Sequence, residues 1–333
     1  RIQITIKLGA VLSKPIAASD LARALAGTTG HDEFERSIRE RKVRRFPAAY
    51  DAAKLKTLFT LARVEAALAS GAIPLAQLDA YQGGQLNKLA ELAATGERTS
   101  QVVRRLFDGG ATIRVRDIHR FDPVLGAFTA AVQDLFAARA QINLYLTPPA
   151  QIGFPPHWDI MDVFVVQVAG CKDWKIFREY QDAVDLPLRG TPWEPQRYLP
   201  IGAPEEFTMQ AGDTLYVPRG AMHQALCTGH GSAHLAIGIE SLTYADFICQ
   251  EVRRLAGEDV ELRCRLPWST SDSPEAMAAL EAAVRQRFGE IAARFDLGAH
   301  LAAERDAIAP VAGEAPAARL FATIDSQPPL DTA

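Results

Sequence analysis

Hydrophobic and polar positions alternate through the middle of the chain, and this period of two is typical of half-buried β-strands. Segments with this pattern, or with the short apolar run of a buried strand, occupy residues 111–115, 142–146, 162–168, 174–177, 206–209, 214–217 and 234–239. Glycines that suit turns punctuate this stretch at Gly170, Gly202, Gly212 and Gly220. Many short strands without alternating long helices predict an antiparallel barrel or double-sheet jelly roll of the cupin type.

The two ends of the chain follow the period of a helix instead. Apolar residues from Ala52 to Ser70 recur every three or four positions, and residues 246–256 do the same. Ser273 is the expected N-cap of a further helix that continues to about Phe295. We therefore predict a mostly helical region over 1–97, a β-rich domain over 98–243 and a helical region over 244–333.

The bulk composition fits an ordinary globular protein and argues against several classes. The chain has 333 residues, of which 48% are hydrophobic and 23% charged, with a net charge of −4. This charge offers no overall attraction to nucleic acid or anionic lipid, so we predict neither direct sequence-specific nucleic-acid binding nor a membrane partner. No apolar run approaches the roughly 20 residues of a membrane span. No secretory signal is visible at the start, and the four cysteines form no CxxC pair, which favours free thiols in the cytoplasm.

One short segment, Arg39–Arg45, is strongly basic. Such a run is most simply a solvated face or a connecting loop between helices. The alternative is a basic rim that meets ribosomal RNA or an acidic partner. The sequence leaves both interpretations open.

Two histidines and an aspartate have the spacing of a metal site. His157 and Asp159 stand two residues apart after a Pro-Pro pair, so in an extended segment their side chains point to the same face. A turn-and-strand unit, Gly212–Gly220, comes shortly before His223. A lone His-x-Asp is common by chance, but this combination is much more specific. Two imidazoles and one carboxylate leave open coordination positions, as a non-haem Fe(II) oxygenase requires.

The segments that carry these residues resemble a known family. Ile142–Phe177 contains Asn-Leu-Tyr-Leu-Thr-Pro-Pro, Gly-Phe-Pro-Pro-His-Trp-Asp and Gly-Cys-Lys-Asp-Trp-Lys-Ile-Phe, and Phe207–Ala225 continues the match. Both are similar to the JmjC/cupin-4 ribosomal oxygenases, which are Fe(II)- and 2-oxoglutarate-dependent protein hydroxylases. The resemblance is specific from about Phe107 to Ile239 and weaker over Thr57–Gly84. It implies a mainly β core, a double-stranded β-helix of the cupin/JmjC type, as the catalytic domain over 98–243, with helical N-terminal and C-terminal regions.

The resemblance also implies the roles of the central residues. His157, Asp159 and His223 would be the catalytic ligands of Fe(II). Lys172 falls where the family places the lysine that pairs with the distal carboxylate of 2-oxoglutarate, a cofactor-binding role that suits a cation facing a dicarboxylate. Without the resemblance, Lys172 would be an ordinary turn lysine after Gly170.

Three further residues are expected near the co-substrate. Asn143 and Tyr145, two apart on one strand face, match positions that line the co-substrate or metal pocket in the family. His234 matches a position near the site on the last barrel strand. Each has a plainer alternative, because strand residues and core histidines are common. Trp158, between two predicted ligands, should face away from the metal.

The implied activity consumes O₂ and 2-oxoglutarate, forms succinate and CO₂, and hydroxylates a side chain of the arginine or histidine class in a ribosomal protein. The helical ends would support a homodimer. Alternatives remain open: a hydroxylase of natural-product precursor peptides, a metal cupin that does not use 2-oxoglutarate, including a zinc or nickel enzyme, and a non-catalytic JmjC-like binding module. Lysine demethylation ranks lower, because the best match is to the hydroxylases.

Overall fold

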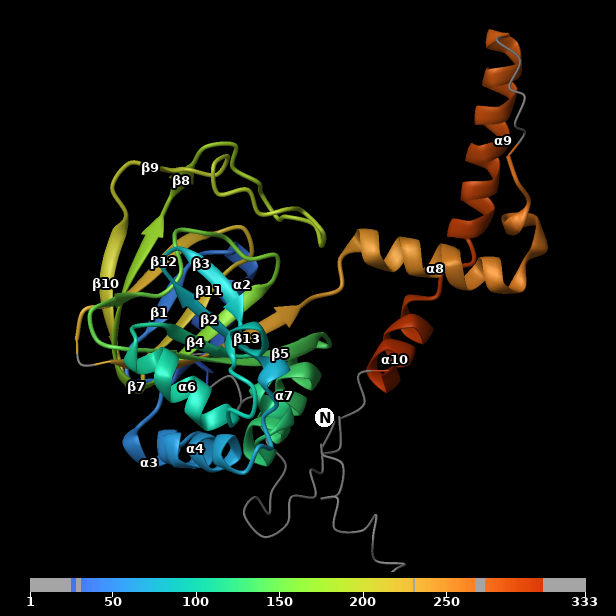
Figure 1. Cartoon of the computed structure of the whole chain (residues 1–333). Coiled ribbons are helices and arrows are strands. Elements are labelled where there is room, and N and C mark those ends of the chain that lie inside the picture. The colour runs from blue at the N-terminus through green and yellow to red at the C-terminus, as the bar shows by residue number, and fades with distance from the viewer. Residues whose placement is uncertain (1–24, 28–30, 230, 267–272, 308–333) are drawn as a thin grey trace, which may run out of the picture. The chain divides into compact units, whose positions relative to one another are not determined.

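The computed structural model describes residues 25–27, 31–229, 231–266 and 273–307. Internal contacts divide them into two compact units, one extending to Glu240 and the other beginning at Ser241. The first unit contains the strands and the second contains helices (Figure 1). None of the helices in the described ranges is long and apolar enough to span a membrane.

The longest strand, β7 (Asp162–Phe177), belongs to two sheets at once. Its first half pairs with β11 and β13, and its second half pairs with β10 and β12. Gly170 lies between the two halves with a φ of +63°. A Cβ at this position would stand 2.0 Å from the carbonyl oxygen of Gly231, so only glycine fits. The bend lets one strand connect both sheets.

The larger sheet has eight strands in the order β1-β11-β7-β13-β5-β4-β2-β3, and every pairing is antiparallel. Apart from β7, its strands are β1 (Arg44–Phe46), β2 (Leu78–Gln82), β3 (Gln85–Lys88), β4 (Thr112–Val115), β5 (Arg139–Thr147), β11 (Thr214–Val217) and β13 (Ser232–Glu240). Phe164, Leu144 and Leu235 are fully buried between this sheet and the helices that cover it. This buried face is the main core of the first unit.

The second sheet is smaller and carries part of the candidate site. It consists of β10 (Glu205–Gln210), the second half of β7, β12 (Met222–Cys227) and β6 (Gln151–Ile152), again antiparallel. A separate two-stranded ribbon joins β8 (Glu179–Tyr180) to β9 (Pro200–Ile201). The two sheets enclose a second hydrophobic cluster around Val165, Trp174 and Leu215.

The first unit also contains helices, of which α7 packs against β5 and α6 against β4 of the larger sheet. They are α2 (His31–Glu40), α3 (Ala52–Leu58), α4 (Leu61–Ala69), α5 (Leu89–Leu92), α6 (Thr99–Asp108) and α7 (Pro123–Phe136). The second unit contains α8 (Tyr244–Glu258), α9 (Pro274–Ala292) and α10 (Leu297–Ala307). Ser273 accepts a hydrogen bond from the Ala276 amide and caps α9, as the sequence predicted.

The structure differs from the sequence-based elements in several places. The segments predicted at 162–168 and 174–177 form the single strand β7. The helix predicted over Ala52–Ser70 is two helices, because Phe59 is extended and Thr60 caps α4. The region up to residue 97 also contains the strands β1, β2 and β3, and the basic run enters β1 at Arg44. Within that run Arg45 forms an ion pair with Asp213 at 2.7 Å, so this arginine has a structural partner.

Candidate metal and co-substrate site

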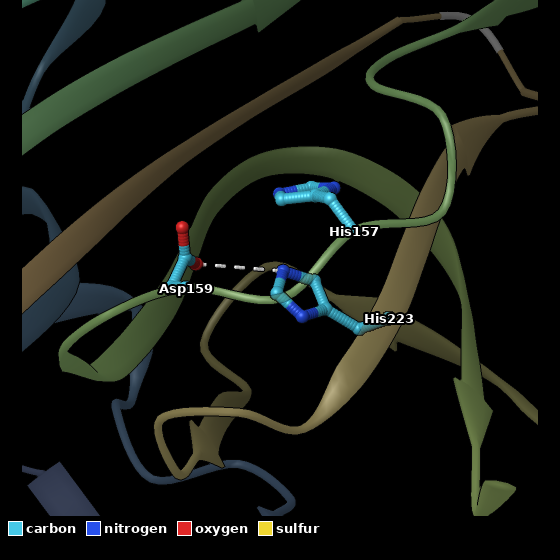
Figure 2. Close-up of side chains that lie close together, drawn as sticks. All are labelled: His157, Asp159 and His223. Atoms are coloured by element: carbon cyan, nitrogen blue, oxygen red, sulfur yellow. Dashed lines mark ion pairs between the residues drawn. The ribbon is translucent and has the colours of Figure 1, made fainter. Parts of the chain in front are cut away.

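The structure brings the three predicted metal ligands together at one point (Figure 2). His223 lies on β12, and the segment with His157 runs beside it, joined by two backbone hydrogen bonds of 2.9 and 2.8 Å. One possible ligand atom from each of His157, Asp159 and His223 lies within 4.8 Å of the others. The Asp159 Oδ2 atom is 3.7 Å from the His223 Nε2 atom. Two neighbouring nitrogens and a carboxylate oxygen can therefore face one cation.

Backbone carbonyls orient both imidazoles. The Nδ1 atom of His157 lies 2.8 Å from the Pro155 carbonyl oxygen, and that of His223 lies 2.9 Å from the Ala221 carbonyl oxygen. Because a carbonyl can only accept, each Nδ1 carries the proton and each Nε2 keeps a free lone pair. This is the arrangement of metal-binding histidines. Burial, together with neighbouring His157, holds the pKa of His223 below its usual value, which favours the neutral imidazole that a metal needs.

These side chains line a cavity of about 450 Å³, including its opening to solvent. The lining residues are Tyr145, Phe154, His157, Asp159, Val163, Val165, Lys172, Trp174, His223, Ala225, His234 and Ala236. One end of the cavity is open to solvent and the other is buried. The Asp159 side chain is 39% exposed, whereas Lys172 is only 2% exposed. Apolar walls with a few polar groups are typical of a small-molecule site.

Lys172 is a buried cation with no carboxylate beside it among the described residues. Its Nζ atom donates a hydrogen bond of 2.9 Å to the Thr147 hydroxyl. Burial lowers the pKa of Lys172 to about 7, because an ammonium group is costly to remove from water. A bound anion would supply the missing counter-charge. The family resemblance, and not the pattern of the sequence, singled out this residue, which in the structure lacks a counter-charge among the described residues.

The three other predicted co-substrate residues differ in their positions. Tyr145 and His234 line the cavity and stack on each other, with ring centroids 4.8 Å apart and an angle of 7° between the planes. The Nδ1 atom of His234 is buried without a hydrogen-bond partner, and burial keeps its pKa well below the usual value. The Asn143 side chain instead accepts a hydrogen bond of 3.1 Å from the Asp117 amide. Its predicted role in the pocket stays a prediction.

Two aromatic residues near the triad have no role in the sequence-based prediction. Trp174 lines the cavity and stacks on His223 with ring centroids 5.9 Å apart. It lies two residues after Lys172 on β7, so strand alternation could have placed it on the same face. Trp193 contacts the His157 ring from a loop, and no periodicity marks it. Trp158, expected to face away from the metal, is buried against Trp193 and Tyr198.

Comparison with known proteins shows which families the chain resembles. Residues 117–247 match the family model of the JmjC domain, which is less than half of the chain. Ribosomal oxygenase 1 of Homo sapiens is 31% identical over 278 residues, covering 80% of this chain and 42% of that protein. The resemblance to the ribosomal oxygenases is confirmed. The chain nevertheless spans less than half the length of this relative.

Two other matches extend the resemblance. The bifunctional lysine-specific demethylase and histidyl-hydroxylase NO66 of Culex quinquefasciatus is 32% identical over 168 residues, covering 48% of this chain and 26% of that protein. The solved structure of Escherichia coli YcfD aligns with a TM-score of 0.53 at 14% identity, covering 79% of this chain and 68% of that chain. The identity to YcfD is low, so this match shows a shared fold alone.

Proposed function

We propose that the protein is an Fe(II)- and 2-oxoglutarate-dependent oxygenase that hydroxylates an amino-acid side chain of a protein or peptide. One observation carries the proposal: the His157, Asp159 and His223 side chains and the buried ammonium of Lys172 line the same cavity. The triad suits a metal that must keep open positions, and the ammonium suits the far end of a dicarboxylate.

The donor set fits Fe(II). Two neutral imidazoles present their Nε2 atoms, and Asp159 offers an anionic oxygen within reach of both. His157, Asp159 and His223 would hold the metal on one side and leave the other side for co-substrate and O₂. Trp174, stacked on His223, would keep that ring in place and water away from its buried face.

The buried end of the cavity fits 2-oxoglutarate. Lys172 would pair with the distal carboxylate, and the Thr147 hydroxyl that accepts its hydrogen bond would help to orient it. Tyr145 and His234 would form the side wall, and the unpartnered His234 Nδ1 atom would be available for a hydrogen bond with the co-substrate. When bound, iron, 2-oxoglutarate and O₂ supply an oxidation that yields succinate and CO₂ and places one oxygen atom on a substrate C–H.

A ribosomal protein is the substrate class that the relatives support. Their names include ribosomal oxygenase and histidyl-hydroxylase, which favour a side chain of the arginine or histidine class. A natural-product precursor peptide is the alternative for the same chemistry. A cupin that does not use 2-oxoglutarate would have no use for the buried Lys172, and a non-catalytic module would have no use for a complete triad.

The finer architecture belongs to the same proposal. The two sheets joined by β7 are consistent with a double-stranded β-helix, with 98–243 as the catalytic domain between the 1–97 and 244–333 regions. We also propose a cytoplasmic homodimer that binds neither membrane nor a specific nucleic-acid sequence. The four cysteines, Cys171, Cys227, Cys249 and Cys264, are free thiols, in line with the sequence-based expectation.

Removing a triad ligand tests the proposed activity. His157→Ala and Asp159→Ala should abolish peptide-dependent succinate formation, because either change removes one of three metal ligands. Both variants should keep the circular dichroism spectrum of the parent, since the sheets close without the metal. Wholesale unfolding of both variants would instead make these residues structural, and undiminished turnover would remove them from the reaction.

A further inference from the structure

The loop 181–199 between β8 and β9 is held by hydrogen bonds at its base and contacts the triad residue His157. At its base the Gln181 amide donates to the Leu199 carbonyl oxygen at 2.8 Å. The Tyr180 hydroxyl accepts a hydrogen bond from the Val184 amide and lies 3.0 Å from the Gly220 carbonyl oxygen, to which it can donate. Compact loops closed at the base in this way frequently carry function.

Trp193 connects this loop to the metal triad. Its ring centroid lies 6.5 Å from that of His157, at an angle of 78° between the ring planes. Trp193 also packs edge-on against Trp158 and stacks on Tyr198, with centroids 5.5 and 5.3 Å away. The indole is only half-buried. It therefore offers aromatic surface next to His157, a proposed metal ligand, where the partly exposed Asp159 marks the more open end of the cavity.

The segment that carries Trp193 is acidic in sequence. Residues 179–206 contain six carboxylates and two arginines, a net charge of −4 that equals the net charge of the whole chain. Three of these carboxylates are partly offset by ion pairs with Arg41, Lys175 and Arg178. Glu194, directly after Trp193, is exposed. Glu194 therefore provides an exposed carboxylate at the sequence position next to the indole.

The same aromatic cluster already binds a guanidinium. The Arg197 side chain lies over the Tyr198 ring, 5.4 Å from its centroid, and Trp193 stacks on that tyrosine. Among the aromatic side chains, tryptophan attracts a cation most strongly. Arg197 also pairs with Asp182 at 3.1 Å, which shows how a cation here is shared between a ring and a carboxylate.

We propose that Trp193, with Glu194, is a specificity-determining site that packs against a cationic side chain of the substrate peptide, next to the residue that reacts. The inference rests on the proposed function for the reaction at the cavity. Binding at Trp193 itself needs neither iron nor 2-oxoglutarate. A direct binding measurement can therefore separate the two claims.

The test compares two fluorescein-labelled octapeptides of glycine and serine that differ at three positions, arginine in one and the neutral isostere citrulline in the other. Fluorescence anisotropy with the full chain should show at least about 10-fold tighter binding of the arginine peptide, with the difference shrinking as salt rises. Equal affinity for the two peptides would overturn the proposal.

Variants of the loop test whether the preference for the arginine peptide depends on Trp193 and Glu194. Trp193→Ala should reduce the arginine preference about 5-fold or more, Trp193→Phe should restore part of it, and Glu194→Gln should weaken it and its salt dependence. Leu188→Ala removes an exposed apolar side chain of the same loop and is the control that should keep the preference. A preference that survives in Trp193→Ala, or is lost equally in Leu188→Ala, contradicts the assignment.

Turnover separates failure of this proposal from failure of the proposed function. If the arginine peptide binds through Trp193 but no succinate forms with any peptide, the surface stands and the oxygenase assignment fails. If succinate forms with both peptides at the same kcat/KM and the two bind equally, the oxygenase assignment stands and the Trp193 site fails.

Discussion

At the scale of single residues, Lys172 gives the clearest electrostatic argument for a bound anion. Its ammonium is buried beside a hydroxyl, with no carboxylate in contact among the described residues. An unpaired buried charge is unfavourable, and the lowered pKa expresses that cost. A carboxylate that enters the cavity would restore the charged form, so binding and protonation of Lys172 are coupled.

This coupling predicts a pH dependence of 2-oxoglutarate binding. With a pKa of about 7 in the free protein, Lys172 loses its proton as pH rises above 7, and the dicarboxylate needs the ammonium form. The dissociation constant measured by calorimetry on the metal-loaded protein should rise about tenfold per pH unit between pH 7.5 and 9. Lys172→Met should bind weakly at every pH, whereas Lys175→Met, on the same strand, should behave as the parent. A flat profile in the parent would show that Lys172 does not pair with the ligand.

Sequence reasoning predicted the triad from the His-x-Asp spacing and from the turn-and-strand unit Gly212–Gly220 that comes shortly before His223. His157 and Asp159 share a face by spacing alone, and the expected proximity of His223 followed from the predicted closure of a barrel. Trp193 could not be found in this way. Its contact with His157 depends on how an irregular loop folds back, and no pattern of the sequence encodes that path.

At the scale of elements, four strands align a row of side chains that leads to the cavity. Asp79 on β2 stands opposite Arg114 on β4, Arg114 opposite Tyr145 on β5, and Tyr145 opposite His234 on β13. Asp79 accepts ion pairs from Arg114 at 2.8 Å and from Arg116 at 3.1 Å. Burial raises the pKa of Tyr145, and the nearby Arg114 guanidinium partly offsets this. The row therefore connects β2 and β4 to the cavity-lining residues on β5 and β13.

Removing the carboxylate of this row should destabilise the fold. Asp79→Ala leaves two arginine side chains without their shared counter-charge at a buried position, which costs about 3 kcal/mol of unfolding free energy. Asp51→Ala, at an exposed helix cap, should cost about 1 kcal/mol and serves as the comparison. Denaturant unfolding measures both, and a loss in Asp79→Ala no larger than in Asp51→Ala would contradict this account of the row.

The sequence predicted the bounds of an element where its hydrophobic residues follow one clear period. It failed where the strand is short or where a capping residue interrupts a helical pattern. Strands β4, β5, β10, β11 and β13 lie at their predicted places. The short strand β12 has too few alternating positions around Gln224 to stand out, although it carries His223. The helix predicted over Ala52–Ser70 is interrupted because Thr60 caps a new helix, a local preference that outweighs continued apolar spacing.

At the scale of the whole molecule, the candidate site lies entirely within the first unit, whereas the second unit exposes apolar side chains. Its helix α9 exposes large apolar side chains, with Met277 41%, Val284 47% and Phe288 50% exposed. Met277, Val284 and Phe288 share one face of the helix by their spacing and form an apolar stripe. In the described part of the second unit much of it stays uncovered, which suits the proposed homodimer.

Charge on this stripe should separate the subunits. The parent should sediment as a dimer, and Val284→Glu and Phe288→Glu should sediment as monomers, because a buried unpaired carboxylate opposes association. Arg285→Glu introduces the same charge at an exposed polar position of α9 and should remain a dimer. A parent that sediments as a monomer at micromolar concentration would contradict the homodimer.

The central claim is that Fe(II) and 2-oxoglutarate share the cavity between the triad and Lys172. The most direct test is an anaerobic titration of the Fe(II)-loaded protein with 2-oxoglutarate, followed by visible absorption. The account predicts a weak metal-to-ligand charge-transfer band that saturates with added 2-oxoglutarate and is lost at the same concentrations in Lys172→Ala. Bound iron without any such band would contradict it.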